Sequence, residues 1–125
     1  MRKTKTIMVT VALMFVFAAT SVNSKRLGPA PIEPVSRNNV VYSVPAFVSG
    51  ETQNGGYIEA RNKASGELIW RLKVYKTEYA RNLERDIQDV FIISIRLEAE
   101  SIVVVDDKDR VFEVNMNTRN ITRKK

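Results

Sequence analysis

Hydrophobic and polar residues alternate with a period of two in the second half of the chain. Over positions 68–74, every second residue is apolar: Leu68, Trp70, Leu72 and Val74. The positions between them include the charged residues Arg71 and Lys73. Successive side chains of a β-strand point to opposite faces of the sheet, so this pattern predicts a half-buried antiparallel strand.

Comparable runs elsewhere predict further strands. β-Branched and aromatic residues gather between turn formers at 40–44, 57–61, 90–97, 102–105 and 111–114. The run 90–97 is apolar on both faces, which predicts a central place in the sheet. Turn-forming residues at 106–110 separate the last two runs and predict a hairpin. The expected fold class is therefore mainly β, a small antiparallel meander of about five or six strands.

The stretch 77–88 departs from the period of two. Its residues Tyr79, Leu83 and Ile87 are spaced four apart, which places them on one stripe of a helix. We expect a short amphipathic helix at 77–88 that covers one end or face of the sheet. The alternative is a long ordered loop, which at this length is typical of a functional insertion.

The first 24 residues predict a secretory signal peptide. Three of the first five residues are basic, and a run of apolar residues from 7 to 19 follows. Such a run has the length of a signal-peptide core and is short for a membrane span. Cleavage is expected between Ser24 and Lys25, with a second candidate site after Ser21.

This prediction places the mature protein outside the cytoplasm, either secreted or in a periplasm. A cleaved signal leaves no stable membrane span, whereas an uncut segment would act as a membrane tether. Residues 25–39 contain three of the four prolines and predict an extended linker. The compact domain is then expected over 40–125, with a basic C-terminal tail.

Removal of the signal changes the charge of the protein. The whole chain carries +6, but its 20 Lys and Arg residues become 17 against 14 Asp and Glu, so the mature part carries +3. That balance gives no nucleic-acid footprint, and no nucleic-acid partner is expected. The excess lies in the tail, at Arg119, Arg123, Lys124 and Lys125, whereas 98–109 is acidic.

The chain contains no cysteine and no histidine. Disulfides and Cys nucleophiles are excluded, and so are His metal ligands and a His general base. Carboxylates remain as candidate catalytic groups. Asp86 and Asp89, with Glu84 nearby, have the residue types of a glycoside-hydrolase pair. Acidic residues between a helix and a strand are, however, more often caps or solvated charges.

A second acidic group lies in the predicted hairpin turn. Asp106, Asp107 and Asp109 resemble the start of a calcium loop, but no glycine stands at the sharp turn that such a loop needs. A plain turn is the favoured interpretation, and neither a metal nor a cofactor is predicted.

Residues 60–70 carry a recognisable motif. A strand ends at Asn62, a turn at Ser65 and Gly66 follows, and Trp70 comes four residues after the glycine. The motif resembles the repeat of quinoprotein (PQQ-type) β-propellers. The residues alone predict a turn in which Asn62 and Ser65 bond nearby backbone groups, Gly66 takes a positive φ, and Trp70 lies in the core.

A degraded second copy lies 53 positions further on. There Asn115 and Thr118 match the Asx and Ser/Thr places, while Arg119 and Arg123 stand where the glycine and tryptophan would be. The resemblance implies blade-like antiparallel hairpins and not a closed ring, because about 100 residues cannot supply four blades. It implies no quinone cofactor, because several blades are needed to hold one.

These observations favour a non-enzymatic exported module with a binding or structural role. Its exposed sheet edges or its amphipathic segment are expected to contact another exported protein or a second copy of the chain. The alternative is a small extracytoplasmic hydrolase that depends on the carboxylates of Asp86 and Asp89.

Overall fold

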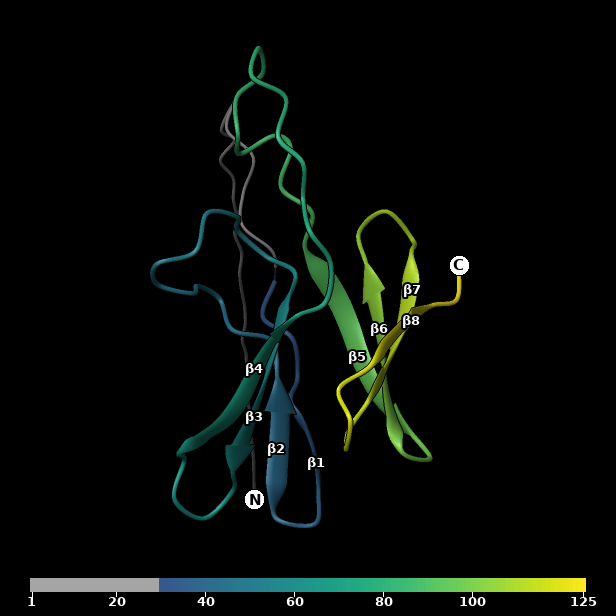
Figure 1. Ribbon diagram of the computed structural model, residues 1–125. Helices are drawn as coiled ribbons and strands as arrows, with labels where there is room; N and C mark the ends of the chain where they lie inside the picture. The colour runs from purple at the N-terminus through teal and green to yellow at the C-terminus, as the bar shows by residue number, and fades with distance from the viewer. Residues whose placement is uncertain (1–29) are drawn as a thin grey trace, which may run out of the picture.

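The computed structural model describes residues 30–125, so the predicted signal peptide and its cleavage position at Ser24 and Lys25 lie outside the described residues. Eight strands form two four-stranded antiparallel sheets, each ordered as in the chain (Figure 1). The first sheet contains β1 (Val35–Arg37), β2 (Val40–Ser43), β3 (Tyr57–Asn62) and β4 (Leu68–Lys73). The second sheet contains β5 (Ile92–Glu98), β6 (Ser101–Asp106), β7 (Val111–Asn115) and β8 (Ile121–Arg123). The mainly β meander expected from the period of two is confirmed.

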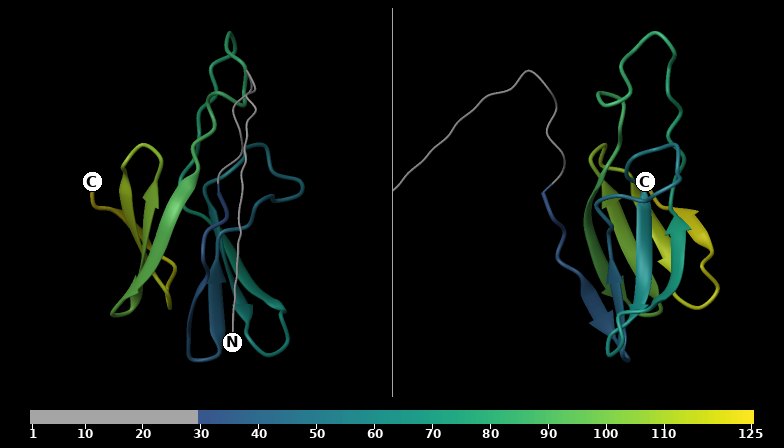
Figure 2. Two further views of the ribbon diagram at one scale, coloured as in Figure 1. Left: turned by 180° about the vertical axis from the view of Figure 1, so that it is seen from behind. Right: turned by 90° about the vertical axis from the view of Figure 1, so that its left-hand side faces the viewer.

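The two sheets face each other and enclose one core (Figure 2). The first sheet contributes Ile58 and Ala60, and the second contributes Ile102, Val104 and Val114, all fully buried. Burying each large aliphatic side chain stabilises the fold by about 1.5–3 kcal/mol. One face of each sheet is thus turned toward the other sheet, and Trp70 and Leu72 pack against the core as their spacing predicted. The inward position predicted for Leu68 is wrong, because a register shift places it opposite Arg61, where it is 42% exposed.

Each sheet begins with a hairpin whose turn is two residues long. The two-residue turn after β1 consists of Asn38 and Asn39, with φ of 53° and 65°, values that suit a type I′ turn and that Asn tolerates. The turn after β5 is also two residues long, at 99–100. In both sheets the second residue of this turn accepts a backbone hydrogen bond of 2.9 Å from the later hairpin, through Lys63 and Met116.

The prediction that 90–97 is a central strand is wrong. In the part of the chain that the structure describes, β5 is an edge strand that pairs only with β6, and β6 occupies the inner position instead. The register shifts between Ile92 and Ser94, which allows Ile92 and Ile95 to enter the core together while Ile93 is 48% exposed. The apolar residues on both faces therefore reflect a β-bulge and not a strand buried on two sides.

The helix expected at 77–88 does not form, and the loop alternative is the correct one. Leu83 and Ile87 are 52% and 54% exposed, so the apolar stripe has no surface to pack against. The side chain of Gln88 instead donates to the carbonyl oxygens of Ala80, Leu83 and Glu84. The described part of the chain contains no helix of the length and apolar character that crossing a bilayer requires.

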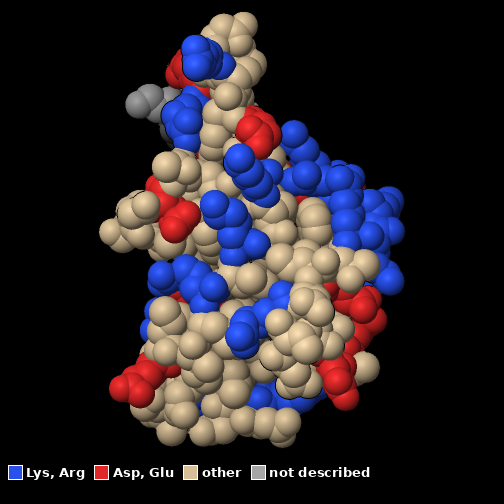
Figure 3. All heavy atoms as spheres, viewed as in Figure 1, with Lys and Arg blue, Asp and Glu red and all other residues tan. Residues whose placement is uncertain are grey.

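Strands form both in the predicted linker, where β1 lies, and in the predicted basic tail, where β8 lies. The predicted linker at 25–39 ends early, because β1 pairs with β2 and Ile32 packs against the core. The predicted basic tail contains β8, which pairs with β7 through Val114 and Ile121. Figure 3 shows Lys and Arg side chains gathered around this C-terminal end of the second sheet. Of the four basic residues assigned to the tail, Arg123 lies in β8, and the other three flank this strand.

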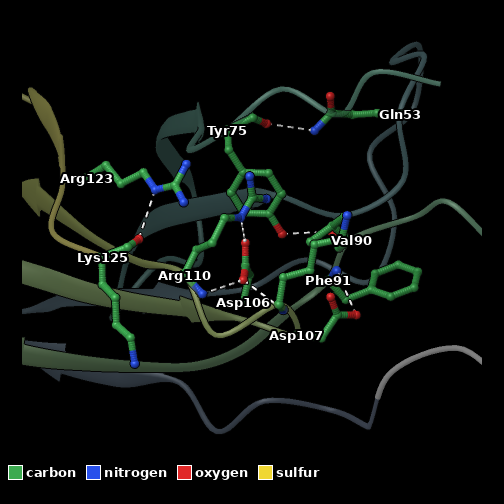
Figure 4. A network of polar contacts seen from close by, with 10 residues as sticks. Gln53, Tyr75, Val90, Phe91, Asp106, Asp107, Arg110, Arg123 and Lys125 are labelled. Carbon is green, nitrogen blue, oxygen red and sulfur yellow. Dashed lines mark hydrogen bonds and ion pairs between the residues drawn. The ribbon is translucent and has the colours of Figure 1, made fainter. Parts of the chain in front are cut away.

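A polar network joins the two sheets around the β6–β7 turn (Figure 4). Asp106 is fully buried, and its carboxylate accepts the backbone N–H groups of Lys108 and Arg110, each at 2.9 Å. The same carboxylate accepts the Arg110 Nε–H at 2.6 Å. The Arg110 guanidinium lies 4.8 Å from the ring centre of Tyr75, whose hydroxyl donates to the Val90 carbonyl at 2.7 Å. The acidic turn is thus a hairpin built on its own carboxylate, as the favoured interpretation predicted.

We expect Asp106→Ala to lower the free energy of unfolding by about 3 kcal/mol, because it leaves the partly buried Arg110 guanidinium and two turn N–H groups without their acceptor. Urea denaturation followed by Trp70 fluorescence measures the loss. Lys108→Ala, which removes an exposed side chain of the same turn, is expected to change stability by less than about 0.5 kcal/mol. Equal stability of the two variants would contradict the role assigned to Asp106.

Candidate functional site

The turn singled out in the sequence is an exposed structural element. Asn62 Oδ1 accepts the N–H groups of Ala64 and Ser65 at 2.9 Å, and Ser65 Oγ accepts the Glu67 N–H at 3.2 Å. Gly66 has a φ of +80°, in the left-handed region that glycine enters without strain. These residues thus hold the β3–β4 hairpin closed, as their types predicted.

The turn between β7 and β8 has the same construction. Asn115 Oδ1 accepts two N–H groups at 2.8 and 2.9 Å, and Thr118 Oγ1 accepts the Asn120 N–H at 3.2 Å. Arg119 takes the place of Gly66, with a φ of 64°. The 53-residue spacing between the two motifs therefore corresponds to equivalent hairpins of the two sheets.

Trp70 lies at the margin of the core. It pairs with Ala60, a fully buried residue, so its side chain is on the inward face of the first sheet. Its ring centre is 6.0 Å from that of Tyr42 on one side. The guanidinium of Arg119, from the other sheet, lies 5.8 Å from the same ring. The residue packs against the core and also faces the rim where β4 and β8 end the two sheets.

The two carboxylates considered for hydrolysis have different surroundings. Asp86 is exposed, whereas Asp89 is buried and accepts the Tyr79 hydroxyl at 2.6 Å and the Asn54 side-chain amide at 3.2 Å. Asp89 thus ties the 77–91 loop to the loop before β3. Within residues 30–125, no group of three or more acidic side chains is placed to hold a metal ion.

An open cleft of about 710 Å³ lies beside Asp89. Its charged lining combines both signs: Lys76, Lys108 and Arg110 with Glu78, Asp89 and Asp107. Because basic and acidic side chains are mixed in this lining, the cleft favours neither anionic nor cationic ligands.

The open edge of β4 is the feature best placed to bind a partner. Among residues 30–125, β4 pairs with β3 alone, and no other strand lies along its second edge. The Val74 N–H donates to the Gly56 carbonyl at 2.7 Å, which sets the alternation of the ladder. By that alternation the backbone groups of Arg71 and Lys73 point away from β3, toward the open edge.

The other edge strands are less suited to pairing. β1 and β8 are three residues long. β5 has seven residues and, like β4, a register shift near its start, but β1 of the first sheet lies against it. β4 has six residues, of which Leu68 and Ile69 are 42% and 51% exposed. Long edge strands with exposed apolar residues are the ones that recruit further strands.

The outward face of β4 is basic and firmly held. Glu59, directly across from Arg71 in the sheet, accepts from the Arg71 guanidinium at 2.6 Å and from Arg61 at 3.1 Å. Lys73 lies 3.6 Å from Glu51 and 5.9 Å from the ring centre of Tyr57. Cations flank the open backbone groups on this face.

Tyr57 lies beside Lys73 and Glu51. The ring is buried, and its hydroxyl donates to Glu51 at 2.9 Å. Burial, together with the adjacent Glu51 carboxylate, raises the pKa of Tyr57 to about 12. Burial also raises the pKa of Tyr75, next to Asp106.

A scan against protein-family models and a search of curated proteins found no match to this chain.

We expect the stability of the fold to decline between pH 10 and about 12. In this range the tyrosines of the unfolded chain lose their protons, whereas Tyr57 keeps its proton in the folded state, so proton loss favours unfolding. Tyr57→Phe removes this contribution and is expected to flatten the decline. Urea unfolding midpoints measured at about one-unit steps from pH 9 to about 12 follow the loss of stability. An identical pH profile for Tyr57→Phe would contradict the contribution assigned to Tyr57.

Proposed function

We propose that this chain is a non-enzymatic exported module that binds another protein by taking a strand of that protein onto the open edge of β4. The observation that carries the proposal is the edge itself. It is a six-residue strand with one paired side, exposed Leu68 and Ile69, and outward-facing backbone groups at Arg71 and Lys73.

The physical basis is the cost of unpaired backbone groups. An added strand satisfies the free N–H and C=O groups of β4 with main-chain hydrogen bonds, and the side chains on either face set the choice of partner. The rest of the described chain supplies a rigid support, because β4 is fixed to β3 and through Trp70 to the core. The predicted signal peptide would bring this support to an exported partner.

A matched pair of variants at one position tests the proposal. Lys73→Pro removes a backbone N–H that faces the open edge and is not part of the β3–β4 ladder. Lys73→Ala removes the same side chain and keeps that N–H. We expect capture of exported proteins by immobilised residues 25–125 to be lost with the proline variant and retained with the alanine variant.

Thermal unfolding of both variants shows whether each is folded before capture is scored. Equal capture by the two folded variants would rule out backbone pairing at β4. Turnover on a panel of glycosides that disappears in Asp89→Asn would instead support the carboxylate hydrolase.

A further inference from the structure

The β4 edge is bordered by a part of the second sheet that no strand of the first sheet covers. β8 is exposed along its whole length. In the right-hand view of Figure 2 the yellow strand of the second sheet lies beyond the β4 edge. A further strand added to the first sheet at β4 would therefore lie above β8.

The inward-facing side chains around this room are partly apolar and partly basic. Trp70 and Leu72 of β4 are half-buried, and both pair with fully buried residues of β3 on the inward face. Ile121 of β8 pairs with the buried Val114, and Arg123 pairs with the buried Phe112, so both side chains lie on the inward face of the second sheet. We call this set, with Arg119, the β4–β8 opening.

The cations of the opening lack acidic partners. Among residues 30–125, neither Arg119 nor Arg123 forms an ion pair with a carboxylate. Arg119 lies over the Trp70 ring, and Arg123 Nε donates to the Lys125 carbonyl at 2.8 Å. Figure 3 shows Lys and Arg side chains down the middle of this face, between the two sheets.

A second copy of the chain is a poor occupant. Two β4 strands that pair antiparallel over residues 69–73, with their inward faces on the same side, place Arg71 opposite Arg71. Like charges directly across a strand pair are destabilising. On this face three cations, Arg61, Arg71 and Lys73, share the two carboxylates of Glu59 and Glu51. The remaining excess of positive charge attracts a strand whose outward-facing residues are acidic.

We propose, building on the proposed function, that the β4–β8 opening binds an extended protein segment with acidic residues at alternate positions and apolar residues between them. The segment adds to β4 as a fifth strand of the first sheet. Its acidic side chains lie beside Arg71 and Lys73, and its apolar side chains cover Leu72 and Ile121. A carboxylate at one end of the segment, on the side that faces β8, lies beside Arg119 and Arg123.

Short synthetic peptides test this chemistry directly. The first probe alternates Glu and Val over about eight residues, the length of a typical strand. Its controls are a peptide that alternates Lys and Val and a block peptide with the four Glu residues before the four Val residues. We expect the alternating acidic peptide to bind residues 25–125 in isothermal titration, and both controls to bind at least about tenfold more weakly.

Charge reversal at β4 is expected to weaken binding of one peptide and to strengthen binding of another. Lys73→Glu is expected to weaken the acidic peptide by on the order of tenfold and to strengthen the alternating basic peptide. N-methylation of the peptide amides that face β4 is expected to abolish binding, whereas methylation of the alternate amides leaves it unchanged. The second set of amides points to solvent in an added strand.

The outcomes separate this inference from the function on which it rests. If the block peptide or a single-stranded oligonucleotide binds as well as the alternating acidic peptide, the opening is a general polyanion site and the inference is wrong. If Lys73→Pro abolishes capture of exported proteins while no acidic peptide binds, the edge function stands and the acidic specificity is wrong. A concentration-dependent dimer in sedimentation that Lys73→Pro disrupts would assign the edge to a second copy.

Discussion

A buried carboxylate, Asp106, ends β6 and holds the turn that follows through three hydrogen bonds. It also fixes the Arg110 guanidinium over the rings of Tyr75 and Phe112, which belong to different halves of the chain. Tyr75 continues the connection to Val90 and, through its carbonyl, to Gln53. The relative position of the two sheets, and hence of β4 and β8, depends on this cluster because four separate chain segments meet there.

Much of the fold could be predicted because alternation directly reports a half-buried strand. Six of the strands fall at predicted runs, and Trp70 and Leu72 face inward as their spacing indicated. β1 and β8 were missed because three-residue strands are too short to show a period. The helix at 77–88 was wrong because spacing alone does not show whether a packing surface exists, and Gln88 closes that loop by local hydrogen bonds that no periodicity records.

The strand edge proposed to bind a partner could be predicted only in part from the sequence. Exposed sheet edges were expected of an isolated β-meander, and the Asn62 and Asn115 motifs correctly located equivalent turns. Which strand is the free edge depends on the number of strands in each sheet. The assignment of Arg119 and Arg123 to a tail hid the position of Arg119 over Trp70 and of Arg123 opposite the buried Phe112. Trp70 and Arg119 are far apart in the chain and come into contact only when the two sheets pack together.

Arg119 occupies a left-handed backbone position that Gly66 fills in the equivalent hairpin. That conformation costs a residue with a side chain about 1 kcal/mol, a cost that glycine does not have. Glycine at this position would, however, remove the guanidinium that lies over Trp70. The two hairpins thus represent opposite solutions of one trade-off: the first relaxes its backbone, and the second gives up stability to retain a charged group at the surface.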